Sequence, residues 1–273
     1  MISFSFAGVE NELNKQMSPQ KLRILKLIAL IFYGQATSIC CCIRYGFLAD
    51  AFLSRGISGT IYGMIEGSLI IGFAFIYLCG GFEKLLTWKR VNSRCLLMFI
   101  TGGYAVTSFC TGLVYLSQDN NVVVIVSTVL RILQGVITYG CPLVAVDFIN
   151  AQHPTEFDFV NGLLNMGYFS GMGMAEVFGC LLYDRYGYLY PFLFSSTIAL
   201  LSTFLIAIAI PKSATYLASQ EETDLLTKKL VNPSTRLSKA IILPLIACMI
   251  INLNFGVLQV IELVTKVINF IKL

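Results

Sequence analysis

Seven long apolar runs divide the sequence, and they constrain its fold more than any other feature. A helix that crosses the hydrocarbon core of a bilayer needs about 20 mostly apolar residues, and each run between charged breaks is close to that length. The runs cover residues 27–46, 59–82, 95–116, 122–149, 160–183, 192–210 and 240–264. Only 12% of the 273 residues are charged and 56% are hydrophobic, whereas a soluble domain carries about 25% charge. The sequence therefore predicts an all-α multi-pass membrane protein surrounded by membrane lipid.

The basic residues lie mostly in alternate connections between these runs. They gather before the first run, between the second and third, and between the sixth and seventh. Lysine and arginine are enriched in cytosolic loops, so we expect a cytosolic N-terminus in a plasma membrane or an intracellular vesicle membrane. Arg44 falls at the margin of the opposite side, and by its position it counts with the outer loops.

The connection after the sixth run divides the chain into parts. It mixes both charge signs with Ser, Thr and Asn-Pro, which is typical of a flexible linker. We expect a cytosolic tail, a six-helix transmembrane half-bundle, a cytosolic linker, and a seventh helix with a short tail, over residues 1–24, 25–210, 211–239 and 240–273. Six helices, a linker and one more helix indicate a repeat bundle that stops early in its second half. We therefore expect a truncated isoform or an incomplete gene model.

Ionisable residues interrupt the runs at a few positions where charge is expensive. Arg131 lies in the sequence Arg-Ile-Leu-Gln-Gly of the fourth run, and Glu66 and Glu176 lie in the second and fifth runs. One interpretation is that Arg131 lines a substrate pathway in which Glu176 or Glu66 carries a proton or binds a cation. The other is a fixed Arg131–Glu176 salt bridge, because both residues fall near the middle of the bilayer. Gln35 and Gln134 are further polar candidates for the pathway.

Small residues recur at every fourth position of the fifth run. They are Gly167, Gly171, Ala175 and Gly179. Residues with this spacing share one face of a helix, and small side chains let a second helix approach closely. We therefore interpret them as a helix-packing stripe. Glu176 is turned about 100° from that stripe.

The remaining chemistry-bearing residues do not form a recognisable site. The nine cysteines lie in or at the ends of apolar runs, where they resemble small buried hydrophobes. The single histidine and the lack of Cys-x-x-Cys pairs argue against a metal site. The sequence has no cluster of His, Asp or Cys at the ends of its predicted helices, which is the pattern that would suggest catalysis. We expect no enzyme activity, no cofactor, no metal and no nucleic-acid partner.

Several segments resemble the major facilitator superfamily of secondary transporters. Arg131, Gln134 and Gly135 match its fourth-helix motif Arg-x-x-Gln-Gly. Residues 179–192 resemble the segment that links helices five and six in its drug and amine antiporters. Residues 47–67 are similar to the first outer loop and second helix of the vesicular amine and polyamine transporters, solute carrier family 18. The resemblance covers about residues 25–265.

Two motifs depart from the family pattern. The cytosolic loop motif Gly-x-x-x-Asp-x-x-Gly-Arg-Lys is matched by Gly81, Lys89 and Arg90, but Leu85 replaces the acid and Trp88 the second glycine. In the fifth run, Ala175 and Glu176 stand where the antiporter motif has Gly-Pro.

The resemblance implies the six-helix N-terminal half of a major facilitator bundle, made of two three-helix repeats, plus one additional transmembrane helix. By analogy, the protein would be a secondary active antiporter that exchanges a small organic solute against protons by alternating access. The solute would be an organic cation, amine or polyamine. The alternative is a non-transporting half-transporter that assembles with, or regulates, a second transporter half.

Overall fold

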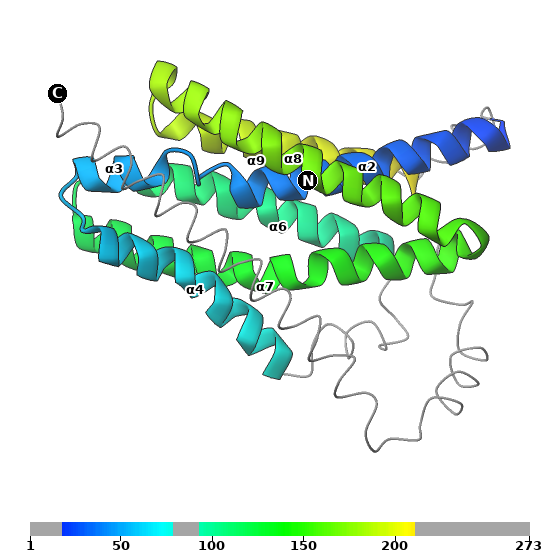
Figure 1. Ribbon diagram of the computed structural model, residues 1–273, viewed down its shortest axis with the longest axis horizontal. Helices are drawn as coiled ribbons and strands as arrows, with labels where there is room; N and C mark the ends of the chain where they lie inside the picture. Colours follow the sequence, from blue (N-terminus) through cyan, green and yellow to red (C-terminus); the bar gives the residue numbers. More distant parts are fainter. Residues whose placement is uncertain (1–17, 79–92, 211–273) are drawn as a thin grey trace, which may run out of the picture. The chain divides into compact units, whose positions relative to one another are not determined.

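The computed structural model describes residues 18–78 and 93–210 (Figure 1). This part consists of helices and connecting turns and contains no strand, so the all-α prediction is confirmed for it. Its elements are α2 (Pro19–Cys42), α3 (Leu48–Ser54), α4 (Gly59–Leu78), α6 (Ser93–Val114), α7 (Asn120–Gln152), the 3₁₀ helix η1 (Pro154–Glu156), α8 (Phe157–Tyr186) and α9 (Leu189–Ala209). The predicted linker, the seventh helix and the loop motif of Gly81, Lys89 and Arg90 lie outside the described residues.

Five of these helices are long and apolar enough to cross a membrane, namely α2, α4, α6, α7 and α9. They correspond to predicted spans one, two, three, four and six, and they are consistent with an integral multi-pass membrane protein. Helix α8 contains the predicted fifth span, residues 160–183, but it is not among these five helices. It has 30 residues, and polar residues such as Asn161, Asn165 and Glu176 interrupt its apolar sequence.

The helices change direction at each connection, so their ends form two groups. At one end, which we call the first end, Arg23 of α2 forms an ion pair with Glu156 of η1. At the second end, the Arg55 guanidinium lies 3.6 Å from the centre of the Tyr115 ring. Arg55 also donates to the backbone oxygen of Ser117 at 2.8 Å and to that of Tyr115. These contacts hold the turn after α3 against the turn between α6 and α7.

The helix pairs follow a repeated pattern. The most extensive pairs are α2–α8, α6–α9 and α4–α7, followed by α2–α9 and α6–α7. Exchanging the first three long helices (α2, α4, α6) with the last three (α7, α8, α9) turns α2–α8 into α4–α7 and α2–α9 into α6–α7. The same exchange leaves α6–α9 unchanged. Figure 1 shows α4 beside α7 and, separately, α2 beside α8.

Glycine permits the closest helix contacts in both equivalent pairs. In the α4–α7 pair, a Cβ atom on Gly135 would collide with the backbone oxygen of Leu69, and Gly72 faces it. In the α2–α8 pair, the stripe of Gly167, Gly171, Ala175 and Gly179 is buried. Within it, a Cβ on Gly171 would lie 2.5 Å from the backbone oxygen of Gln35. Side chains are therefore excluded where these helix backbones meet.

Candidate functional site

Helix α7 provides two buried polar side chains one turn apart. Arg131 and Gln134 are each 1% exposed, and the Arg131 Nη1 atom donates to the Gln134 Oε1 atom at 2.9 Å. Residues three apart lie on the same face of a helix, so the spacing of the Arg-x-x-Gln motif itself produces this contact. Arg131 lies about 16 Å along α7 from its start, at a rise of about 1.5 Å per residue.

Helix α4 brings the carboxylate of Glu66 to this pair. Glu66 Oε2 forms an ion pair with Arg131 Nη2, and the Glu66 side chain is 14% exposed. The close contact of Gly72 with Gly135 keeps the two helix axes near enough for this pairing. The Ser68 hydroxyl on α4 also donates to the Thr128 backbone oxygen on α7, at 3.4 Å.

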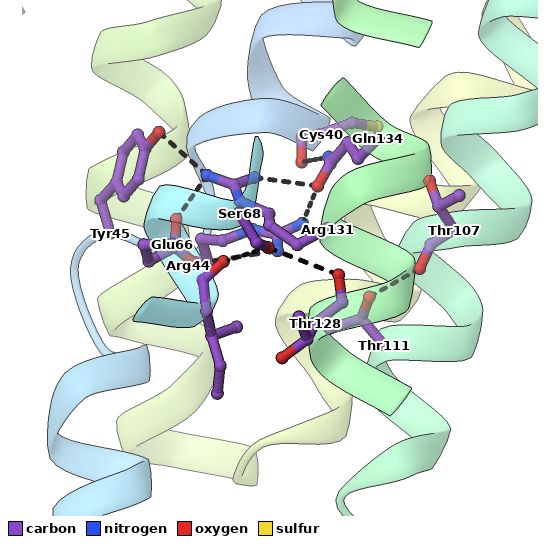
Figure 2. A network of polar contacts seen from close by, with 11 residues as sticks. Cys40, Arg44, Tyr45, Glu66, Ser68, Thr107, Thr111, Thr128, Arg131 and Gln134 are labelled. Carbon is purple, nitrogen blue, oxygen red and sulfur yellow. Dashed lines mark hydrogen bonds and ion pairs between the residues drawn. The ribbon is translucent and has the colours of Figure 1, made fainter. Parts of the chain in front are cut away.

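The turn after α2 adds a second arginine and a tyrosine (Figure 2). Arg44 is 3% exposed, and its Nη2 atom donates to the same Gln134 Oε1 atom at 2.5 Å. Its Nη1 atom lies 3.9 Å from Glu66 Oε1. The Tyr45 hydroxyl accepts from Arg131 Nη2 at 3.1 Å, and Figure 2 shows this hydroxyl directed at the guanidinium.

The Gln134 amide connects the parts of this cluster. Its oxygen accepts from both guanidiniums, and its nitrogen donates to the backbone oxygen of Cys40 at 3.0 Å. Three chain segments therefore meet at one amide: α7, the end of α2 and the turn that follows it. We call Arg44, Tyr45, Glu66, Arg131 and Gln134 the arginine cluster.

The arginine cluster contains two guanidiniums and one carboxylate. Arginine does not lose its proton in proteins, so the cluster carries an excess positive charge among the described residues when Glu66 is ionised. Three of its buried polar atoms have no hydrogen-bond partner among those residues: Arg44 Nε, Arg131 Nε and Glu66 Oε1. Buried charges are costly unless they are paired and hydrogen-bonded, and this cluster is only partly satisfied.

The structure brings together three of the five predicted pathway residues: Arg131, Glu66 and Gln134. Glu176 lies elsewhere, with its side chain exposed on α8. The ion pair of Arg131 is formed with Glu66, so the alternative of a fixed Arg131–Glu176 bridge does not describe this structure. The physical reason is that α7 packs mainly on α4 and α6, whereas α8 packs mainly on α2.

Gln35 belongs to the α2–α8 contact and not to the arginine cluster. Its Nε2 atom lies 3.2 Å from the sulfur of Met174, a weak acceptor. Its backbone lies against Gly171.

Arg44 and Tyr45 are cluster members that are not among the residues predicted from the sequence. Because Arg44 follows the first apolar run, its position in the sequence indicates the margin of the outer side. The sequence feature that indicates a buried Arg44 is its apolar surroundings. The residues before it are Cys40, Cys41, Cys42 and Ile43, and an apolar stretch follows Tyr45. An isolated arginine with apolar residues on both sides is the same pattern that singled out Arg131.

A second group of charged residues lies at the first end. The exposed Arg23–Glu156 ion pair borders a cavity of about 460 Å³ that is lined mainly by residues 154–159. Burial lowers the pKa of the neighbouring His153, and the positive charges of Lys26 and Arg23 lower it further, while Glu156 acts in the opposite direction. In the described ranges, no three His, Cys, Asp or Glu side chains are close enough together to hold a metal ion.

Comparison with known proteins gave no match, either to a protein-family model or to a curated protein.

Proposed function

We propose that the chain is a secondary active transporter of the major facilitator superfamily, which moves a small organic solute by alternating access with proton coupling. The sequence motifs around Arg131 and residues 179–192 support this assignment. The repeated helix pairing supports it as well, because such transporters are built from structural repeats. Under this proposal, α2, α4 and α6 form one three-helix repeat, and α7, α8 and α9 form the other.

The observation that carries the proposal is the arginine cluster. Ionisable residues inside a membrane protein are expensive, and they mark substrate pathways and proton relays more often than packing. Here two buried guanidiniums and a carboxylate whose side chain is 14% exposed lie between α4, α7 and the turn after α2. A purely structural role would be served at lower cost by apolar packing, because a buried ion pair rarely stabilises more than a hydrophobic replacement.

Glu66 is the proton-carrying candidate within the cluster. The arginines remain charged, so Glu66 is the member with a carboxyl group that can change its charge. Protonation would convert its ion pair with Arg131 into a weaker contact between a charged guanidinium and a neutral carboxyl group. The strength of the contact between α4 and α7 would then depend on the protonation state of Glu66. Binding or release of a proton would in this way be coupled to a movement of the two helices.

The expected cationic solute finds little support in the arginine cluster itself. Glu66 is already paired with Arg131, and a free cation would meet two guanidiniums. Glu176 is exposed and outside the cluster, so it is the remaining predicted pathway acid for a cationic solute. An amine therefore remains a proposal that depends on the family resemblance and on Glu176.

Uptake into proteoliposomes tests the transport proposal. The purified chain is reconstituted, a proton gradient is imposed, and entry of labelled spermidine and labelled benzoate is measured in parallel. We expect gradient-driven uptake of at least one solute. Glu66→Gln should abolish the dependence on the gradient, and the matched control Glu156→Gln, at the exposed first end, should keep it. Absence of gradient-driven uptake for both probes would overturn the proposal and favour a non-transporting assembly role.

A further inference from the structure

The charge mismatch of the arginine cluster points to a missing negative partner. Arg131 has a close ion pair with Glu66, a hydrogen bond to Gln134 and one to Tyr45. Arg44 is almost as deeply buried. Its one described hydrogen bond, however, is to the neutral amide oxygen of Gln134, and its approach to Glu66 Oε1 is long, at 3.9 Å.

The carboxylate of Glu66 pairs closely with Arg131 and does not form a second close ion pair with Arg44. Its Oε2 atom is used by Arg131, and its Oε1 atom has no hydrogen-bond partner among the described residues. A guanidinium has five donors, so Arg44 keeps unused donors in a buried site. The charge of Arg44 is therefore not matched by a carboxylate of its own in the described part of the chain.

We propose that Arg44 binds a carboxylate anion, which completes the arginine cluster with one further negative charge. A guanidinium matches a carboxylate in charge and in planar geometry. Glu66 would stay paired with Arg131, and the anion would occupy the side of Arg44 that Gln134 does not use.

This inference changes the class of solute for the site, and to that extent it rests on the transport proposal. A solute held here would carry a carboxylate. If it also carried an amine, the amine would have to lie away from the two guanidiniums.

Thermal unfolding of the full chain in detergent tests for the anion. Buried thiols such as Cys40, Cys42 and Cys141 become reactive on unfolding, so a thiol-reactive fluorophore reports the transition. Sodium acetate is titrated against sodium chloride at equal ionic strength. We expect acetate to raise the unfolding temperature saturably and beyond the effect of chloride. No saturable excess over chloride would overturn the proposal.

Two variants and a control locate the effect. Arg44→Gln should lose the acetate response, whereas Arg23→Gln, at an arginine whose side chain is 51% exposed, should keep it. Gln134→Glu places a carboxylate between the two guanidiniums. It should respond to acetate little or not at all, although it also loses the hydrogen bond from Gln134 to the Cys40 backbone oxygen. If Gln134→Glu still responds fully to acetate, the proposal fails even where Arg44→Gln does not fold.

The acetate experiment and the uptake experiment test the two proposals independently. An Arg44-dependent acetate effect without gradient-driven uptake would keep the anion site and reject transport. Gradient-driven uptake without any acetate effect would keep transport and reject the anion site.

Discussion

Among single residues, Arg131 has the largest energetic consequence. Replacing it with alanine leaves Glu66 buried beside Arg44 at a distance too long for a hydrogen bond. Breaking a buried ion pair by removing one partner typically costs about 3–5 kcal/mol. We expect Arg131→Ala to lower the free energy of unfolding by an amount in that range, measured by denaturant titration in detergent micelles.

A double variant shows whether the stability loss in Arg131→Ala comes from leaving the Glu66 carboxylate without its partner or from lost packing. Arg131→Ala combined with Glu66→Ala removes both partners, so it should be destabilised less than the sum of the two single variants. The matched control is Arg23→Ala. Its ion pair with Glu156 is exposed, so the loss should be below about 1 kcal/mol. Strict additivity of the cluster variants would contradict the coupling between Arg131 and Glu66.

The single histidine predicts how stability changes with pH. Because the pKa of His153 is lowered in the folded chain, the unfolded chain takes up this proton first as the pH falls. The free energy of unfolding should therefore decrease as the pH falls below about 6.5, down to the folded-state pKa. His153→Asn should remove this part of the pH dependence, as measured by unfolding between about pH 5 and pH 8. An unchanged slope in the variant would show that another group is responsible.

Residue type and spacing identified part of the site. Arg131 and Gln134 are one helical turn apart, so their mutual contact follows from local geometry. Which acid meets Arg131 depends on which helix lies beside α7, and the sequence does not contain that information locally. For this reason the sequence alone does not decide whether Glu66 or Glu176 pairs with Arg131. Arg44 is not predicted as a site residue, because its position near a helix end is typical of a solvated loop arginine.

At the scale of elements, the glycines of α8 make a sharp pair of predictions. Gly171→Ala would place a Cβ 2.5 Å from the Gln35 backbone oxygen and 2.9 Å from its Cα, so α2 and α8 would have to move apart. We expect a loss of about 1–3 kcal/mol in the free energy of unfolding, measured in detergent micelles.

Gly173→Ala is the matched control on the same helix. A Cβ at Gly173 would meet nothing within 4 Å, and alanine is the better helix former by up to about 1 kcal/mol. Stability should therefore stay constant or increase slightly. Equal destabilisation by both variants would mean that the α2–α8 contact at Gly171 does not determine the effect.

The existence of the elements was predictable because apolar length alone selects membrane helices. Helix ends were less well predicted. The first helix begins at Pro19, with Ser18 as its N-cap, ahead of the apolar run that was used to locate it. The charged side chains of Lys21 and Arg23 interrupt the hydropathy signal there but not the backbone hydrogen bonding. The pairing of α4 with α7 depends on contacts between distant segments, which hydropathy does not report.

For the whole molecule, the distribution of basic residues predicts an orientation. The first end carries Lys21, Arg23, Lys26 and Arg94, so we expect it to face the cytosol. An exposed cysteine is introduced at each end, as Thr155→Cys at the first end and Gln118→Cys at the second, in a Cys95→Ser background. A membrane-impermeant maleimide should label position 118 in intact cells, and position 155 only after permeabilisation. The reverse pattern would contradict the orientation.

The repeated helix pairing is a property of the whole bundle that no single segment contains. The sequence indicated it only through the family resemblance. In the structure it follows from which helices lie side by side, since α4–α7 and α2–α8 are equivalent under exchange of the two sets of three helices. Both pairs also meet through glycine, at Gly135 in one and Gly171 in the other.

The contact between Gly72 and Gly135 has a mechanical consequence for the arginine cluster. The backbones of α4 and α7 touch there, next to Gln134 and about 9 Å along α4 from Glu66, given a rise of about 1.5 Å per residue. The Glu66–Arg131 ion pair and the Ser68–Thr128 hydrogen bond join the same two helices at other points along their length. A side chain added at Gly72 or Gly135 would push α4 and α7 apart, and it would therefore lengthen the distance that the Glu66–Arg131 ion pair has to span.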